Sequence, residues 1–208
     1  MLSSITPLGE RAKGNSWTLT TSAYVVGSLL GGALLGLLAS PLTALAGLLT
    51  PTVSLAVLAL ILLGGAAADR WGPAPPSIPR QVNENWLTAY RGWVYGFGFG
   101  TQLGFGLVTI ITSWSMWTVV AAIILSSGGA DAAAPWPLPL SSVIVGATFG
   151  LARGLVLLVA RSAVDTDSLA ALHRRIGTGA QRSARLTSWL LTTLGLVAVA
   201  ALITEGIA

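Results

Sequence analysis

Residues 92–106 read GWVYGFGFGTQLGFG, and this stretch decides the class of the fold. Its glycines recur at every fourth position, at Gly92, Gly96, Gly100 and Gly104. Residues four apart on an α-helix lie on one face, so these glycines form a ridge without side chains. In water each glycine costs a helix about 1 kcal/mol relative to alanine, but in a bilayer an unpaired backbone costs more. The stretch therefore predicts a membrane helix whose bare ridge admits a close neighbour.

A second ladder of glycines with the same spacing follows at Gly146, Gly150 and Gly154. Small residues at this spacing let helix backbones approach closely in membranes. All seven glycines are therefore expected to serve helix packing, and the two ladders are candidate partners for each other.

The composition of the whole chain agrees with an all-α integral membrane protein. Hydrophobic residues make up 53% of the 208 residues and charged residues only 9%, whereas soluble domains carry about 25% charged residues. The chain has no cysteine, which excludes disulfides, thiolate metal sites and thiol relays. Neither a metal nor a cofactor is expected.

Long uncharged runs predict a bundle of five membrane spans within one transmembrane domain over residues 1–208. The charge-free run 17–66 is too long for one crossing of about 30 Å and must fold back. Ser40-Pro41 is the best break, and Thr50-Pro51 is the second choice. The predicted spans cover residues 17–39, 43–66, 92–126, 138–160 and 186–204.

The third span, 92–126, is long for one crossing. It is expected to tilt, to kink near Ser113-Trp114-Ser115 or to emerge from the bilayer, and its division into two crossings would give six spans. With five spans and a cytoplasmic N-terminus, every Lys and Arg except Arg153 falls in the N-terminal segment or in the cytoplasmic loops 67–91 and 161–185. This distribution follows the positive-inside rule and disfavours six spans.

Within the loop 161–185, residues 167–176 are predicted to form a short amphipathic helix. Asp165 and Asp167 are expected to cap its start, and His173 lies near its end beside two arginines. A single histidine without a carboxylate partner favours a basic, lipid-facing helix over a metal ligand or a catalytic base. The sequence therefore predicts no enzyme.

Arg153 is the one charged residue inside a predicted span. A charge at this depth costs about 2.5 kcal/mol or more, so such residues usually have a function. Arg153 shares the glycine face of its helix, which favours an interior position over snorkelling to the headgroups. No Asp or Glu lies in a predicted span, so its candidate partners are polar side chains at similar depth: Tyr24, Gln102, and Thr192 or Thr193.

Such a site would favour an anion, because its one formal charge is positive. The alternative is that Gln102 and the threonines only hold neighbouring helices together. Proton relays in pumps usually run through membrane Asp, Glu or His, so a proton-coupled mechanism built on side chains is not expected.

Two stretches resemble the CcdA/DsbD transmembrane family, within the LysE-type exporter group. They are Gly27–Ala39 running into Ser40-Pro41-Leu42-Thr43, and the glycine-rich helix Tyr95–Gly106. The resemblance implies a helical bundle with two related halves. In that family a Pro-Cys step in each half carries a thiol relay. Here Leu42 follows Pro41, so the resemblance does not imply electron transfer.

Two hypotheses for the function follow. The first is a small-solute transporter or exporter in a bacterial cytoplasmic (inner) membrane, which binds an anion through Arg153, Gln102, Tyr24 and Thr192. The second is a non-catalytic subunit or assembly factor of a larger membrane complex, or a homo-oligomer, whose glycine faces receive partner helices. The lipid bilayer is the expected surrounding, and nucleic acid is not an expected partner, because topology explains the basic residues. An open polar cavity would favour the first hypothesis and an exposed glycine ladder the second.

Overall fold

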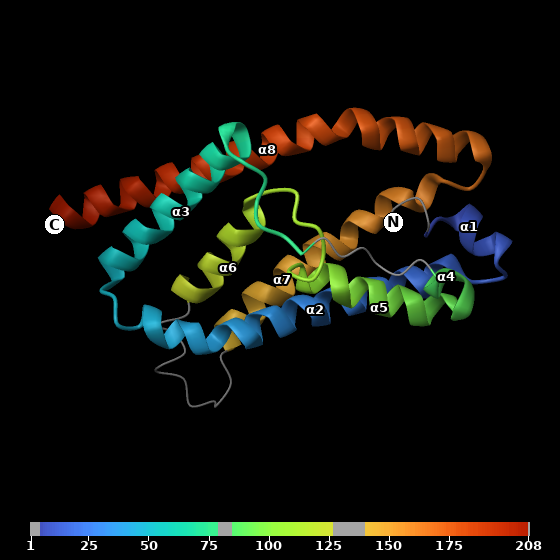
Figure 1. The fold of residues 1–208 in the computed structure, drawn as a ribbon, viewed down its shortest axis with the longest axis horizontal. Helices are drawn as coiled ribbons and strands as arrows, with labels where there is room; N and C mark the ends of the chain where they lie inside the picture. Colours follow the sequence, from blue (N-terminus) through green and yellow to red (C-terminus); the bar gives the residue numbers. More distant parts are fainter. Residues whose placement is uncertain (1–4, 79–84, 127–139, 208) are drawn as a thin grey trace. The chain divides into compact units, whose positions relative to one another are not determined.

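The computed structural model describes residues 5–78, 85–126 and 140–207, and every regular element in these ranges is a helix (Figure 1). The prediction of an all-α protein is confirmed. The elements are α1 (Pro7–Ala12), α2 (Trp17–Ala46), α3 (Pro51–Trp71), α4 (Trp86–Ala89), α5 (Gly92–Phe105), α6 (Ser115–Ser126), α7 (Leu140–Leu155), the 3-10 helix η1 (Val156–Ser162) and α8 (Thr166–Ile207).

Four segments of these helices are long and apolar enough to cross a membrane. They are Trp17–Thr43, Pro51–Trp71, Leu140–Ser162 and Arg182–Thr204. They correspond to the first, second, fourth and fifth predicted spans, as expected of a multi-pass membrane protein. The start predicted for the fourth span, at residue 138, lies outside the described residues.

The predicted third span, 92–126, does not form one continuous helix. α5 ends at Phe105, and Gly106 follows with a φ of 78°, a positive value that glycine adopts more readily than other residues. The N–H of Gly106 donates to the carbonyl of Gln102 and closes the last turn of α5. The break then extends to Ser113-Trp114-Ser115, the place of the expected kink, where α6 begins.

The expected break at Ser40-Pro41 is wrong, because α2 continues through Pro41 to Ala46. The chain turns instead at the second choice, and α3 starts at Pro51. Pro41 leaves the carbonyl of Leu37 without its helical N–H donor. The Ser40 hydroxyl donates to that carbonyl over 2.7 Å and replaces the missing bond, so the helix persists.

The polar loop expected over residues 161–185 is largely helical. α8 is one helix of 42 residues, so the predicted amphipathic helix 167–176 and the fifth span join without a break. The start of α8 packs on the end of η1 and the residue after it through Leu169, Leu172, Ala160 and Ala163. Part of its apolar face therefore contacts protein, where the sequence suggested a lipid-facing helix.

The chain divides into two compact units. The first comprises Met1–Leu34, Ser77–Ile110 and Gly146–Ala180, and the second comprises Leu35–Pro76, Ile111–Val145 and Gln181–Ala208. Helices α2, α7 and α8 each contribute residues to both units. The prediction of a single transmembrane domain over residues 1–208 stays a prediction.

In the first unit α2 lies directly against α5 and α7. A Cβ atom at Gly100 would lie 2.1 Å from the carbonyl oxygen of Tyr24, and one at Gly104 would lie 2.0 Å from that of Ser28. At Gly150 of α7, a Cβ atom would lie 2.1 Å from the same Ser28 oxygen. The glycines therefore bring three helix backbones together around Ser28.

Both glycine ladders have their closest neighbours on α2, which corrects the mutual pairing expected from the sequence. The contacts with α5 advance together along both helices, so α5 runs parallel to α2. The contacts with α7 run from Gly32 near Gly146 back to Val25 near Gly154, so α7 runs antiparallel to α2.

In the second unit α3 packs against α6 and α8, and Figure 1 shows α3 beside the C-terminal half of α8. Leu62 and Ala66 of α3 form a small core with Leu191 of α8. The hydroxyl of Ser188 donates to the carbonyl of Ala66 over 3.2 Å. Side chains, more than backbones, make these contacts.

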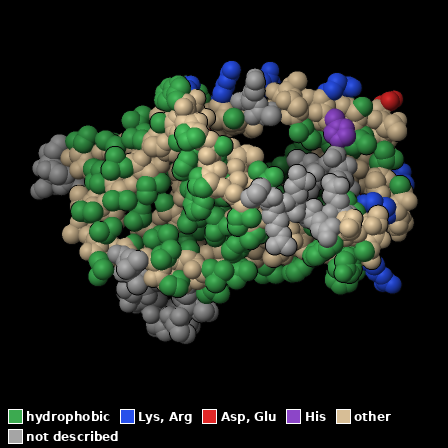
Figure 2. All heavy atoms as spheres, viewed as in Figure 1, with side chains coloured by type: hydrophobic (Ala, Val, Ile, Leu, Met, Phe, Trp, Pro, Cys, Tyr) green, Lys and Arg blue, Asp and Glu red, His purple; other side chains and the backbone are tan. Residues whose placement is uncertain are grey.

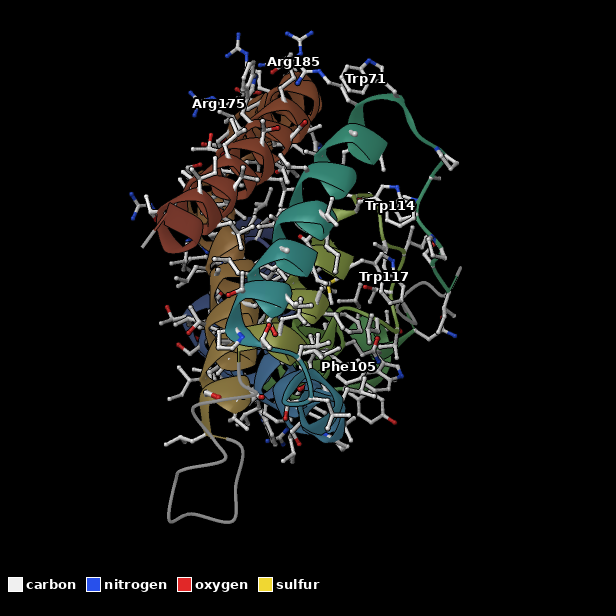
Figure 3. The ribbon with its side chains drawn as sticks, turned by 90° about the vertical axis from the view of Figure 1, so that its left-hand side faces the viewer. Trp71, Phe105, Trp114, Trp117, Arg175 and Arg185 are labelled. Atoms are coloured by element: carbon white, nitrogen blue, oxygen red, sulfur yellow. The ribbon has the colours of Figure 1, made fainter. Side chains whose placement is uncertain are left out.

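The start of α6 is held by the end of α3 and by the segment that follows it. Asp69 accepts hydrogen bonds from the Ser113 hydroxyl and from the backbone N–H of Trp114, both at 2.7 Å. The indole N–H groups of Trp114 and Trp117 donate to the carbonyls of Pro73 and Pro76, and both rings lie beside this segment in Figure 3. A carboxylate at a helix N-terminus also complements the helix dipole.

Candidate functional site

Arg153 lies in the membrane segment Leu140–Ser162 and is half-buried. Its guanidinium carbon lies 5.4 Å from the ring centroid of Phe149, one turn earlier on α7. Arg153 lies near enough to Tyr24 on α2, a side chain that is only 4% exposed, for its charge to favour the ionised form of that phenol. The structure thus brings together two of the four residues predicted for an anion site.

The close approach of α7 to α2 makes this juxtaposition possible. A Cβ atom at Gly154 would lie 2.8 Å from the Ser28 Cβ, and one at Gly32 would lie 2.8 Å from the Gly150 Cα. Because the glycines leave no side chains between the helices, the residues that flank the contact meet at its edge. Tyr24 and Arg153 are such flanking residues.

The other two predicted residues have different surroundings. Gln102 is half-buried on α5, next to Thr101, whose carbonyl oxygen would lie 2.2 Å from a Cβ atom at Gly31. Thr192 belongs to the second unit, where its hydroxyl donates to the carbonyl of Ser188 over 2.8 Å. Thr193 donates in the same way to Trp189 over 2.9 Å. Both threonine hydroxyls therefore donate to carbonyls of their own helix.

Sequence reasoning missed a buried carboxylate in the N-terminal segment. Glu10 of α1 is 0% exposed and accepts hydrogen bonds from the Thr20 hydroxyl, at 2.9 Å, and from the Tyr95 hydroxyl. The Lys13 ammonium lies 3.5 Å from the Glu10 carboxylate and 5.2 Å from the centroid of the Tyr95 ring. Glu10 therefore joins α1 to the first turns of α2 and α5.

Asn15 and Gly92 complete this group. The Asn15 amide donates to the Tyr95 hydroxyl, and its oxygen accepts from the N–H of Gly92, each at 3.4 Å. A Cβ atom at Gly92 would lie 2.3 Å from the Thr20 hydroxyl and 3.0 Å from the Glu10 carboxylate. Gly92, the first glycine of its ladder, therefore makes room for polar side chains as well as for a helix.

One signal in the sequence pointed to this arrangement. Thr6-Pro7 is a helix start, with a capping hydroxyl followed by proline at the first helical position. In the structure the Thr6 hydroxyl accepts from the N–H of Gly9 over 3.1 Å, and α1 begins at Pro7. A short helix at this point fixes the direction of Glu10, although no sequence pattern shows which helices it meets.

The basic residues of α8 are exposed. On the face in Figure 2, Lys and Arg side chains gather along the edge where α8 lies, and Figure 3 shows Arg175 and Arg185 pointing away from the helix. His173 is also exposed. Asp165 directly precedes α8 and accepts from the N–H of Ser168 over 2.8 Å, as expected of a cap. This bond, with a further one from the Ser168 hydroxyl, lowers the pKa of Asp165 below its ordinary value.

Within residues 5–78, 85–126 and 140–207, no three His, Asp or Glu side chains gather into a group that would hold a metal ion. Comparison of the chain with protein-family models, with curated proteins and with solved structures finds no match.

Proposed function

We propose that this chain is a small-anion transporter of a bacterial cytoplasmic membrane, with its N-terminus in the cytoplasm. The observation that carries the proposal is Arg153, a half-buried cation in a membrane segment, near the buried side chain of Tyr24. A cation beside a hydroxyl donor, in a region of low dielectric constant, attracts a negatively charged solute. The positive charges at the predicted cytoplasmic ends of the helices would draw anions toward it.

The interrupted region 92–126 supports the same proposal. Non-helical backbone at membrane depth is tolerated only where protein buries it or where it lines a water-filled cavity. Broken membrane helices of this kind form the binding sites of many transporters. Here Gly106 ends α5, and the buried Thr109 hydroxyl donates to the Gly106 carbonyl over 2.9 Å.

The relative directions of the helices support five crossings. α7 is antiparallel to α2, so the two start on opposite sides of the membrane. If α3 returns the chain to the side where α2 began, the chain must cross once more before α7. α5 runs parallel to α2, and we assign this crossing to the interrupted third span that begins with α5.

The second hypothesis, a subunit of a larger complex, drew its support from glycine ladders free to receive partner helices. In the first unit α2 covers both ladders, and Gly92, Gly96, Gly100, Gly104, Gly146, Gly150 and Gly154 are buried within the chain itself. Among residues 5–78, 85–126 and 140–207, these two ladders therefore pack within the chain and are not available to a partner helix.

The test is anion flux in liposomes that contain the purified chain, with chloride, nitrate and iodide as probes. Arg153→Cys should lower the flux at least about tenfold, the effect of losing one charge-assisted hydrogen bond. Because the chain has no other cysteine, a thiol reagent that carries an amine would restore a positive charge at this position alone. Flux should return with that reagent and should not return with a neutral reagent of the same size.

Arg185→Cys is the matched control, because Arg185 is exposed on α8. Its flux should equal that of the unchanged chain before and after either reagent. Liposomes in which the unchanged chain conducts no anion, or in which Arg153→Cys conducts as well as it, would overturn the proposal.

A further inference from the structure

Two buried polar atoms near the start of α2 have no hydrogen-bond partner. They are the indole Nε1 of Trp17 and the hydroxyl oxygen of Thr21, and Thr21 is 4% exposed. Buried polar atoms in folded proteins nearly always have a partner in the protein, in ordered water or in a ligand. Each exception needs a physical explanation.

The hydroxyls around Thr21 show that pairing is the rule in this helix. Thr20 donates to Glu10, and Ser28 donates to the Gly100 carbonyl over 3.0 Å. Ser40 and Thr43 donate to carbonyls of their own helix, each over 2.7 Å. Thr21 lies in the same helix, but its hydroxyl donates neither to another helix nor to a carbonyl of its own helix.

The two atoms belong to one face of α2. Trp17 and Thr21 are four residues apart, so their side chains are neighbours about 6 Å apart at Cβ. Tyr24, three residues further on, continues the same face. Trp17 also packs on the buried cluster that contains Tyr24 and Leu157. The face therefore points into the first unit and ends at the residue that interacts with Arg153.

The chemistry of the two groups selects the ligand. An indole N–H only donates, and a threonine hydroxyl both donates and accepts. A ligand that pairs with the indole must therefore offer an acceptor, to which the hydroxyl can also donate. Both donors are neutral and sit beside an apolar cluster, so the site cannot repay the desolvation of a multiply charged anion. A monovalent, weakly hydrated anion such as nitrate or iodide fits both conditions.

We propose that Trp17 Nε1 and Thr21 Oγ1 form a second subsite for such an anion, beside the Arg153–Tyr24 subsite. This inference rests on the proposed function and adds a path to it. At about 1.5 Å of rise per residue, the backbone positions of Trp17, Thr21 and Tyr24 follow one another at intervals of about 6 Å and 4.5 Å along α2. Several weak sites in a row let an anion enter and also leave.

The test uses two variants that keep shape and remove one donor each. Thr21→Val replaces the hydroxyl by a methyl group, and Trp17→Phe keeps an aromatic ring without the N–H. The matched controls are Thr18→Val and Trp93→Phe, because both residues are exposed. Anion flux in liposomes and the unfolding midpoint in detergent would be measured over a range of nitrate concentrations, with gluconate holding the ionic strength constant.

Each donor variant should raise the nitrate concentration for half-maximal flux about tenfold, the effect of losing one hydrogen bond to a charged group. Nitrate should raise the unfolding midpoint of the unchanged chain more than that of Thr21→Val. Both controls should behave like the unchanged chain.

Other outcomes separate the two proposals. If Arg153→Cys loses flux while Thr21→Val and Trp17→Phe keep the half-maximal concentration of the unchanged chain, the second subsite is refuted and the transport function stands. A bound water would give this result. If the unchanged chain conducts no anion, the unfolding midpoints decide. An effect of nitrate that Thr21→Val abolishes would keep the site as a binding site, and equal midpoints would refute it.

Discussion

Glycine serves opposite kinds of contact around α2 and around α3. Around α2 the glycines meet backbone: a Cβ atom at Gly104 would lie 2.0 Å from the Ser28 oxygen and 2.6 Å from the Ser28 Cα. Around α3 they meet the ends of side chains. A Cβ atom at Gly65 would lie 2.7 Å from the Thr118 Cγ2, and one at Gly195 would lie 2.7 Å from the Leu63 Cδ2.

The difference lies in what can move. A side chain relieves a clash by rotating, whereas a helix backbone moves only as a whole and takes its other contacts with it. A glycine therefore marks a rigid contact where it meets the backbone at α2 and an adjustable contact where it meets side chains at α3. Four predictions test how far this difference holds.

Gly104→Ala should have the largest effect. Its methyl group collides with the backbone of Ser28, so α2 and α5 must separate along the whole ladder, at a cost of about 3 kcal/mol or more in the free energy of unfolding. Unfolding of the purified chain in mixed micelles measures this cost. The control is Gly64→Ala, because a Cβ atom there meets nothing within 4 Å. Equal stability of the two variants would contradict the rigid contact.

Glu10→Gln should come next. The amide keeps the size of the carboxylate but loses the charge that three side chains surround, so unfolding should become easier by about 2 kcal/mol. Asp69→Asn is the counterpart in the second unit, and because Asp69 is half-exposed its loss should be about 1 kcal/mol or less. The same unfolding assay compares the two variants. A larger loss for Asp69→Asn would reverse the assignment of the stronger polar contact.

Gly65→Ala should cost about 1 kcal/mol or less, because the Thr118 methyl group can rotate away and alanine itself favours the helix. The difference between Gly65→Ala and Gly104→Ala is the sharpest measure of the two kinds of contact. A loss at Gly65 as large as that at Gly104 would mean that α3 and α6 are held as rigidly as α2 and α5.

The smallest effect should come from Asp165, which lies outside the membrane segments. Because the Ser168 N–H lowers the folded pKa of this carboxyl, its stabilising contribution is complete at neutral pH and is lost as the pH falls through that lowered value. The unfolding midpoints of the unchanged chain and of Asp165→Asn should therefore differ at about pH 6 and converge as the pH falls below the ordinary pKa of an aspartate. A constant difference over this interval would show that the carboxylate is not the cap.

The membrane-spanning helices are the part of the fold that the sequence predicts best, because each lies in a long uncharged run. Four of the five predicted spans correspond to helices long and apolar enough to cross a membrane. Spacing also predicts that glycines pack, because only small residues allow such contact. It does not predict the partner, since Gly100 and Gly150 both lie against α2, which has its own small residues. The choice among close-fitting helices depends on the whole bundle.

Local sequence rules for helix ends fail where one side chain replaces a hydrogen bond that a neighbouring residue removes. Pro41 should end α2, but the Ser40 hydroxyl takes over the carbonyl that Pro41 leaves free. Gly106 was counted as part of a long span, although glycine after a helix is a common terminator. For the site, the similar depth of Tyr24 and Arg153 along their helices predicted that the two lie near each other. The partners of Glu10 depend on the tertiary fold, which no local pattern in the sequence shows.

The parallel contact of α2 and α5 has a consequence for how the chain can change in length. Its contacts repeat at every fourth residue, with Tyr24 over Gly100 and Ser28 over Gly104. Inserting or deleting one residue between these pairs would turn the rest of the helix by about 100° and carry every later glycine off the contact. Related chains should therefore vary in length at the connections between helices and keep these two helix segments free of insertions.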